Sequence, residues 1–129
     1  MSLVVQKFGG TSVADAERMR EVAHHVSRTV RRGDQVVLVV SAMGKETDEL
    51  LRLAGEVSVV HPGREMDMLI TAGERKAMAL VCMALHHIGI DSESFTGSQA
   101  GFLTDNNHQN AKILDVRPSR VQASVDAGR

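Results

Sequence analysis

The stretch that decides the fold is Leu3-Val4-Val5-Gln6-Lys7-Phe8-Gly9-Gly10-Thr11-Ser12. Its first six residues predict a buried strand, and apolar residues recur at helical spacing soon after its end. Ser12 and Asp15 fit a capping box, which predicts a helix that begins at Ser12. Gly9 and Gly10 have no Cβ, so a ligand can approach the backbone closely between the strand and the helix.

This corner has the character of a phosphate-binding site. The free N–H groups in the first turn of a helix carry positive potential that favours an anion, and Lys7 adds a full positive charge. Strand–glycine–helix junctions also occur in proteins that bind nothing there, so these residues alone leave both interpretations open. Neither a P-loop nor a G-x-G-x-x-G motif is present, so a different phosphate-binding family is required.

Composition limits the size of the fold and its partners. With 129 residues, 43% of them apolar, the chain can form one core but not two comfortable domains. Lys and Arg total 15 against 16 Asp and Glu, and 2% of the residues are aromatic. This balance argues against nucleic acid as a partner. No apolar stretch approaches the roughly 18 residues needed to cross a membrane, so no membrane association is expected.

Cys82 is the only cysteine and lies in an apolar helical run. We expect it to pack in the interior, because free cysteine is often buried. A lone thiol forms no intrachain disulfide and no signal peptide is visible, so we expect a cytoplasmic protein. No His, Cys or Asp spacing indicates a metal site.

Strand-like and helix-like segments alternate along the rest of the chain. Residues 35–40 predict a second strand that is apolar on both faces, which is typical of parallel sheets covered by helices. The order of segments predicts a mainly parallel α/β sheet with helices on both faces. Two more strands are expected, at 93–96 and 112–116, with a polar loop at 105–109 between them. Three helices are also expected: one that ends at Arg31-Arg32 with Gly33 as its stop, one that begins near Thr47, and one from Pro118 to near Gly128.

A long helix is expected over about 64–88. Gly73 interrupts it and is about 1 kcal/mol less favourable there than Ala, so we expect a break near this residue. The expected inner stripe consists of Leu69, Ala72, Leu80, Val81, Ala84, Leu85 and Ile88.

Ligands of open α/β sheets gather beyond the carboxyl ends of the strands. Three polar, glycine-bearing loops follow predicted strands, at Lys7 with Gly9-Gly10, at 41–44 and at 96–98. Their shared position favours a small-molecule site at this edge.

Five stretches in register make the chain resemble the aspartate kinases over nearly its whole length. The resemblance implies the amino acid kinase fold, a three-layer αβα sandwich, of which residues 1–129 would be the N-terminal portion of the catalytic domain. The five stretches are Val5–Val13, Val39–Gly44, Leu69–Arg75, Ser94–Gly101 and His108–Ile113.

The resemblance implies transfer of the ATP γ-phosphoryl group, with Mg²⁺, to the side-chain carboxylate of L-aspartate, in lysine, threonine and methionine synthesis. A carboxylate with a reference pKa of about 3.9 is already ionised and needs no general base. Catalysis then rests on positioning and charge neutralisation. By resemblance Lys7 is the catalytic, phosphate-contacting lysine, and Gly9, Gly10 and Ser41 lie beside the phosphates. A solvated strand end remains the alternative for Lys7.

Two further residues are implied on the substrate side. Thr47 matches a threonine that contacts aspartate, and Glu74 matches the glutamate that receives its α-ammonium group, a charge-assisted pairing. Alternatively, Thr47 caps its helix, and Glu74 forms an exposed ion pair with Arg75. The pair Lys45-Glu46 departs from the family pattern before Thr47.

The family's later Arg-Gly-Gly-Ser-Asp segment and its ACT-type regulatory domains are absent from this sequence. We therefore expect little turnover from the chain alone, and self-association through uncovered apolar faces. Two alternatives remain. One is another kinase of the superfamily, acting on acetylglutamate, a carbamate or UMP. The other is a non-catalytic module that binds phosphate-bearing ligands or assembles.

Overall fold

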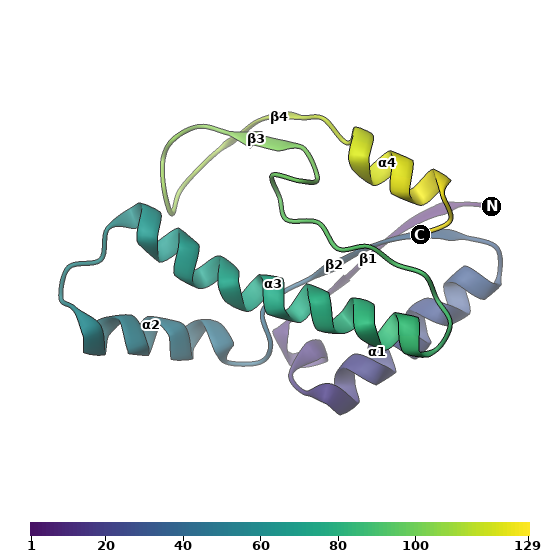
Figure 1. The fold of residues 1–129 in the computed structure, drawn as a ribbon, viewed down its shortest axis with the longest axis horizontal. Helices are drawn as coiled ribbons and strands as arrows, with labels where there is room; N and C mark the ends of the chain where they lie inside the picture. Colours follow the sequence, from purple (N-terminus) through teal and green to yellow (C-terminus); the bar gives the residue numbers. More distant parts are fainter.

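Two parallel strands, β1 (Leu3–Phe8) and β2 (Gln35–Val40), lie at the centre of the computed structural model, which describes residues 1–129 (Figure 1). Both strands have the bounds that the sequence predicted. Around them are η1 (Gly10–Val13), α1 (Ala16–Arg31), α2 (Glu46–Val57), α3 (Gly63–His87), β3 (Phe102–Thr104), β4 (Ile113–Val116) and α4 (Ser119–Asp126).

Helices lie on both faces of the strand pair, as predicted, while Leu3 and Val5 of β1 stay exposed on the face opposite α1. Alternate residues of a strand face opposite sides of a sheet. On one face, the Gln6 side-chain amide donates to the Thr29 hydroxyl of α1 at 2.9 Å. On the other, the Gln35 side-chain amide donates to the Val125 carbonyl of α4 at 3.4 Å. The strands accordingly run between α1 and α4 (Figure 1). The expected αβα layering is confirmed.

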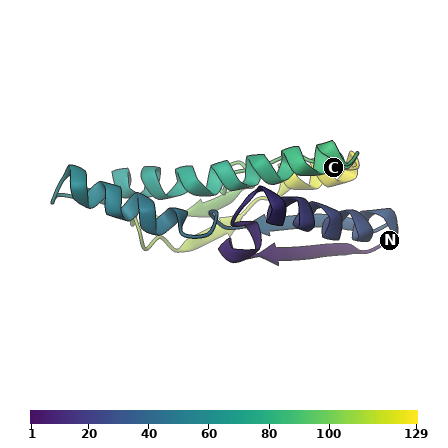
Figure 2. The same cartoon turned by 90° about the horizontal axis from the view of Figure 1, so that it is seen from below.

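The core lies between α1, α3 and the strand pair. Its α1 members recur at the predicted helical spacing, and α3 contributes residues four apart, which lie on one face of a helix. Figure 2 shows β1 at the outer edge of the molecule, so one side of β1 has no neighbouring strand. The buried cluster consists of Val13, Met19, Val22, Ala23, Val26, Ala77, Val81 and Leu85. No helix combines the length and apolar character needed to span a membrane.

The predicted helix start at Ser12 is wrong. The chain first makes the short 3₁₀ turn η1, in which the Ser12 N–H donates to the Gly9 carbonyl at 3.0 Å. Asp15 is itself the cap of α1, because its carboxylate accepts from the Arg18 N–H at 2.8 Å. The capping residue therefore lies three positions later than the capping-box pattern indicated.

The predicted break at Gly73 is also wrong, since α3 runs without interruption from Gly63 to His87. Gly73 is buried at the approach of α2 to α3. A Cβ at this position would lie 3.0 Å from Glu46 Cγ and 3.2 Å from Leu50 Cδ1. The glycine thus serves close packing between the helices. The expected inner stripe of α3 is also partly wrong, because Ala72 and Leu80 are exposed whereas Met66 and Ala77 are buried.

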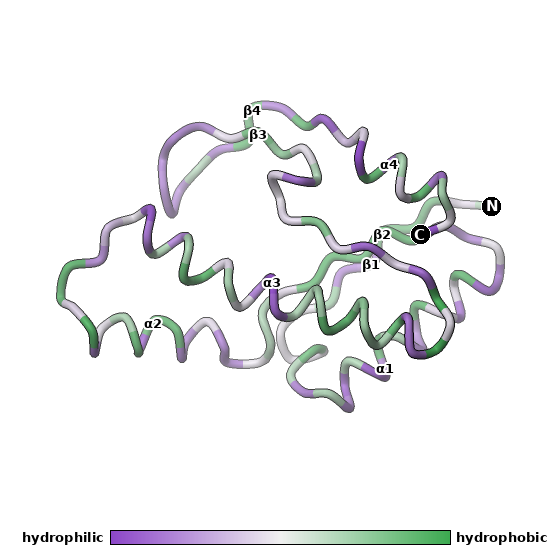
Figure 3. Tube along the Cα trace, in the orientation of Figure 1, coloured by the Kyte–Doolittle hydropathy of each residue, from purple (hydrophilic) through white to green (hydrophobic).

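The predicted strand at 93–96 is absent, because this extended segment forms no ladder with another strand. Instead, β3 and β4 pair antiparallel in a separate hairpin. At the end of the hairpin opposite its loop, Gly101 has φ +91° and accepts from the Arg117 N–H, and a Cβ there would overlap the Arg117 carbonyl oxygen. The strand predicted at 112–116 is therefore present, but not in the parallel sheet. Figure 3 shows the hydrophilic loop that joins β3 to β4.

Two leucines of α3, Leu80 and Leu85, distinguish the observed core face from the expected one. Leu85→Ala should lower the free energy of unfolding by about 2–5 kcal/mol, because Leu85 is 4% exposed in the core. Leu80→Ala, the matched control at a residue 37% exposed, should lower it by about 1 kcal/mol or less. Urea unfolding of both variants provides the measurement. Equal losses would contradict the observed orientation of α3.

Candidate functional site

The loops that follow β1 and β2 meet at one edge of the strand pair, because the strands are parallel and in register. The last residues, Phe8 and Val40, are register partners. Beyond them, the Gly44 N–H donates to the Gly10 carbonyl at 2.8 Å. Two of the three loops that the sequence placed at this edge are thus joined through their backbones.

Gly10 and Gly9 have different surroundings. A Cβ on Gly10 would lie 2.9 Å from the Ala42 carbonyl oxygen and 3.2 Å from that of Gly44. No atom lies within 4 Å of a Cβ placed on Gly9, which is exposed. Gly10 therefore permits the contact between the loops, whereas Gly9 leaves its backbone open to a ligand. We name Gly9, Gly10 and the loop 41–44 the glycine corner.

Lys7 lies beside the glycine corner and is exposed. It points away from α1, because its neighbour Gln6 faces that helix. No Asp or Glu of the chain forms an ion pair with it. Its register partner is Val39, two residues before the half-buried Ser41. Lys7 therefore brings to the corner an ammonium group with no internal counter-charge.

Thr47 and Glu74 come from the two helices that meet at Gly73. Thr47 is half-buried in the first turn of α2, and Glu74 is exposed on α3 directly after Gly73. A Cβ at Gly73 would also lie 3.4 Å from the Cβ of Ala42, a residue of the glycine corner. The contact at Gly73 thus links the two halves of the predicted site.

The structure decides against two alternative roles. Thr47 does not cap α2, because Lys45 occupies the N-cap position and no side chain bonds there. Glu74 and Arg75 form no ion pair with each other.

The third predicted loop, 96–98, is not brought to the glycine corner by any hydrogen bond. It is closed on itself, since the Thr96 N–H donates to the Gln99 side-chain oxygen at 3.0 Å and the Phe102 N–H to the Gly97 carbonyl. The observed contacts therefore do not confirm the prediction that this loop forms part of the site.

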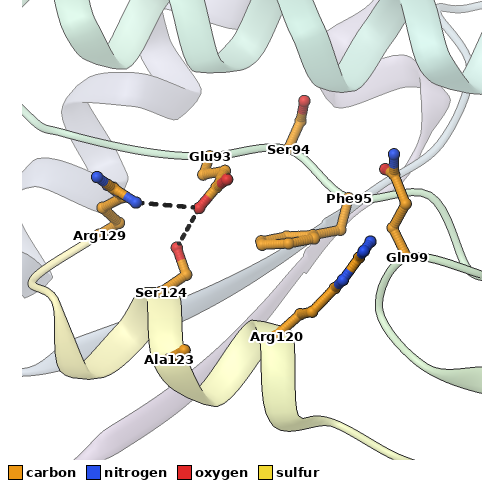
Figure 4. Close-up of a pocket in the computed structure, with 8 residues that line it drawn as sticks. All are labelled: Glu93, Ser94, Phe95, Gln99, Arg120, Ala123, Ser124 and Arg129. Atoms are coloured by element: carbon orange, nitrogen blue, oxygen red, sulfur yellow. Dashed lines mark hydrogen bonds and ion pairs between the residues drawn. The ribbon is translucent and has the colours of Figure 1, made fainter.

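Two open hollows flank the fold. One, of about 360 Å³, lies between the segment 93–99 and α4, where Glu93 accepts from Ser124 and Arg129 (Figure 4). It contains no predicted site residue. The other, of about 660 Å³, is lined by Phe8, Thr11 and Ser12 together with residues of α1. Neither is enclosed, and neither is lined by a residue of the glycine corner.

Sequence reasoning missed one contact of this region. The Lys76 ammonium of α3 lies 2.8 Å from the Glu46 carboxylate of α2. The partners are 30 residues apart, on separate helices. No local pattern joins residues so far apart, so only the observed packing reveals the pair.

The chain is similar in sequence and in fold to known proteins. The sequence pattern of the amino acid kinase family matches residues 2–129. The chain is 57% identical to the aspartokinase of Mycolicibacterium smegmatis and 56% identical to that of Corynebacterium glutamicum, over 100% of its own length and 31% of theirs. The crystal structure of aspartate kinase from Synechocystis matches with a TM-score of 0.83 and 44% identity, over 98% of this chain and 20% of that one.

These matches confirm the resemblance and the fold expected from the five motifs. The chain spans about a third of the length of the curated relatives it matches.

The two glycines of the corner should respond differently to the same substitution. Gly10→Ala should lower the free energy of unfolding by about 1–3 kcal/mol, because the added methyl group meets two carbonyl oxygens. Gly9→Ala should change it by less than about 0.5 kcal/mol, since the site is open and φ is −75°. Both values follow from urea unfolding curves. A Gly10→Ala variant as stable as Gly9→Ala would show that the loops do not touch in solution.

Proposed function

We propose that this chain, which belongs to the amino acid kinase family, forms the phosphate-binding part of an aspartate kinase active site. The reaction is transfer of the ATP γ-phosphoryl group to the side-chain carboxylate of L-aspartate, which gives 4-phospho-L-aspartate. The observation that carries the proposal is the exposed, unpaired Lys7 beside the open backbone of Gly9. The names and identities of the relatives support the choice of substrate.

The main barrier in this reaction is electrostatic. An ionised carboxylate must approach a polyanionic triphosphate, so the protein gains most by holding both anions in line and neutralising their charge. Lys7 supplies a cation, and the Gly9 and Gly10 backbones and Ser41 lie where they can border the phosphates. No group of three or more His, Cys, Asp and Glu side chains converges in the chain. Mg²⁺ would arrive with the nucleotide and would add to the charge neutralisation at its phosphates.

Thr47 and Glu74 are proposed to receive the amino acid. A fixed carboxylate is a suitable partner for an α-ammonium group, and it discriminates against dicarboxylates that lack one. Glu74 is available for this role because it is exposed and forms no ion pair within the chain. Thr47 lies on α2, one residue after Glu46, whose side chain packs against Gly73 of α3.

We further propose that residues 1–129 correspond to the N-terminal portion of the catalytic domain and turn over slowly by themselves. The matched aspartokinases are about three times as long, so much of their structure has no counterpart in this chain. The product of the reaction would serve lysine, threonine and methionine synthesis.

Self-association is the remaining part of the proposal. Leu3, Val5 and Val39 are 55%, 66% and 43% exposed, and the first two lie on the strand whose outer edge is unpaired. An exposed apolar face beside a free strand edge favours pairing with another copy.

Lys7→Ala should weaken ATP binding about 10- to 150-fold, because a charge-assisted contact of about 1.5–3 kcal/mol is lost. Calorimetric titration with Mg·ATP measures this. The matched control is Lys112→Ala, an exposed lysine in the β3–β4 loop, which should bind ATP as the unaltered chain does. Equal affinity of all three proteins would remove the phosphate-binding role and favour an assembly module.

Val5→Lys should reduce self-association by placing a charge on the open sheet face. Sedimentation velocity over a range of concentrations gives the measurement. Val59→Lys is the control, since Val59 is 96% exposed and lies outside the strands. A chain that is monomeric before any substitution, even at high concentration, would exclude this surface as an interface.

A further inference from the structure

We propose that the ion pair between Glu46 and Lys76 positions the substrate loop, defined here as residues 41–47, for the amino acid. This inference rests on the proposed function, since it concerns how Thr47 and Glu74 are brought into place. Glu46 and Lys76 are positioning residues and are not expected to touch the substrate. Glu46 also belongs to the departure from the family pattern noted in the sequence, at Lys45-Glu46.

The pair joins α2 to α3 beside the close contact at Gly73. The Lys76 ammonium and the Glu46 carboxylate are 2.8 Å apart, and the two side chains are 48% and 28% exposed. Glu46 Cγ would lie 3.0 Å from a Cβ at Gly73. The stem of Glu46 is therefore held against α3 while its carboxylate is held by Lys76.

Neither partner has another counter-charge within reach on its own helix. Side chains interact along a helix at separations of three or four residues. For Lys76 these positions are Ala72, Gly73, Ala79 and Leu80, none of which is acidic. For Glu46 they are Glu49 and Leu50. It is also the one ion pair in the chain that joins two helices.

The ion pair holds one end of the substrate loop, and a hydrogen bond to the Gly10 carbonyl holds its middle. The Gly44 N–H donates to the Gly10 carbonyl, and the Glu46 N–H donates to the Met43 carbonyl, both at 2.8 Å. With Glu46 fixed to α3, the next residue, Thr47, has a defined position relative to Glu74. Loss of the pair would leave the loop held only by its backbone contacts.

Charge adds a second effect. The first turn of α2 contains Glu46, Asp48 and Glu49. An unpaired Glu46 beside Thr47 would repel the two carboxylates of aspartate, and Lys76 neutralises it. The pair therefore combines placement of Thr47 with relief of like-charge repulsion.

The test compares Glu46→Gln, Lys76→Met and the charge swap Glu46→Lys with Lys76→Glu, all in this chain. The control is Glu56→Gln, which removes the exposed pair of Glu56 with Arg52 at the far end of α2. NMR titration with L-aspartate in saturating Mg·ATP gives the aspartate affinity, and calorimetry gives the ATP affinity. Each single substitution should weaken aspartate binding about 2- to 5-fold, as expected for loss of a partly exposed ion pair. ATP affinity should not change, and the swap should recover at least half of the loss.

The outcomes separate this inference from the proposed function. If the unaltered chain binds ATP but not aspartate, the choice of aspartate as substrate fails and the inference fails with it. If the unaltered chain binds aspartate and both single variants bind it as tightly as Glu56→Gln does, the inference alone fails. Equal weakening of ATP and aspartate binding would also overturn it, because that result indicates general loosening of the fold.

Discussion

The contact between two backbones at Gly10 and Gly44 is the constraint on which the rest of the site depends. The parallel register of β1 and β2 brings both strand ends to one edge, but the loops beyond them meet only because Gly10 has no side chain. The Gly44 N–H can then reach the Gly10 carbonyl. This contact fixes the start of η1 relative to the loop before α2. It also leaves the neighbouring Gly9 exposed, beside a lysine without an internal counter-charge.

A second close approach extends this arrangement to the helices. Ala42 lies beside Gly10 on one side and would contact a Cβ at Gly73 on the other. Two glycines far apart in the sequence therefore flank one buried alanine, and through it the strand edge is coupled to α3. The charges follow the same division. The cation Lys7 lies toward the strand edge, whereas Glu74 and the neutralised Glu46 lie toward the helices. In the proposed function, Lys7 receives the phosphates and the unpaired Glu74 receives the ammonium group.

The sequence predicted most of the elements but not how several of them are used. Strands 3–8 and 35–40 and the stop of α1 at Gly33 follow from apolar runs and a glycine at positive φ, which are local properties. The break at Gly73 and the inward position of Leu80 were wrong, because helix propensity takes no account of a neighbouring helix. The strand at 93–96 was wrong because a strand requires a partner, and strand-like residues do not reveal whether one is present.

By itself, the sequence determined that an α/β fold would carry a lysine and two glycines at a strand end, since these features depend on residues adjacent along the chain. It also determined, through five motifs, the family to which the chain is similar. Only the tertiary structure decided that Gly10 joins loops while Gly9 stays open, and that Lys76 finds Glu46. The physical reason is that steric exclusion and ion pairing act through space, between residues whose separation along the chain carries no information about their distance.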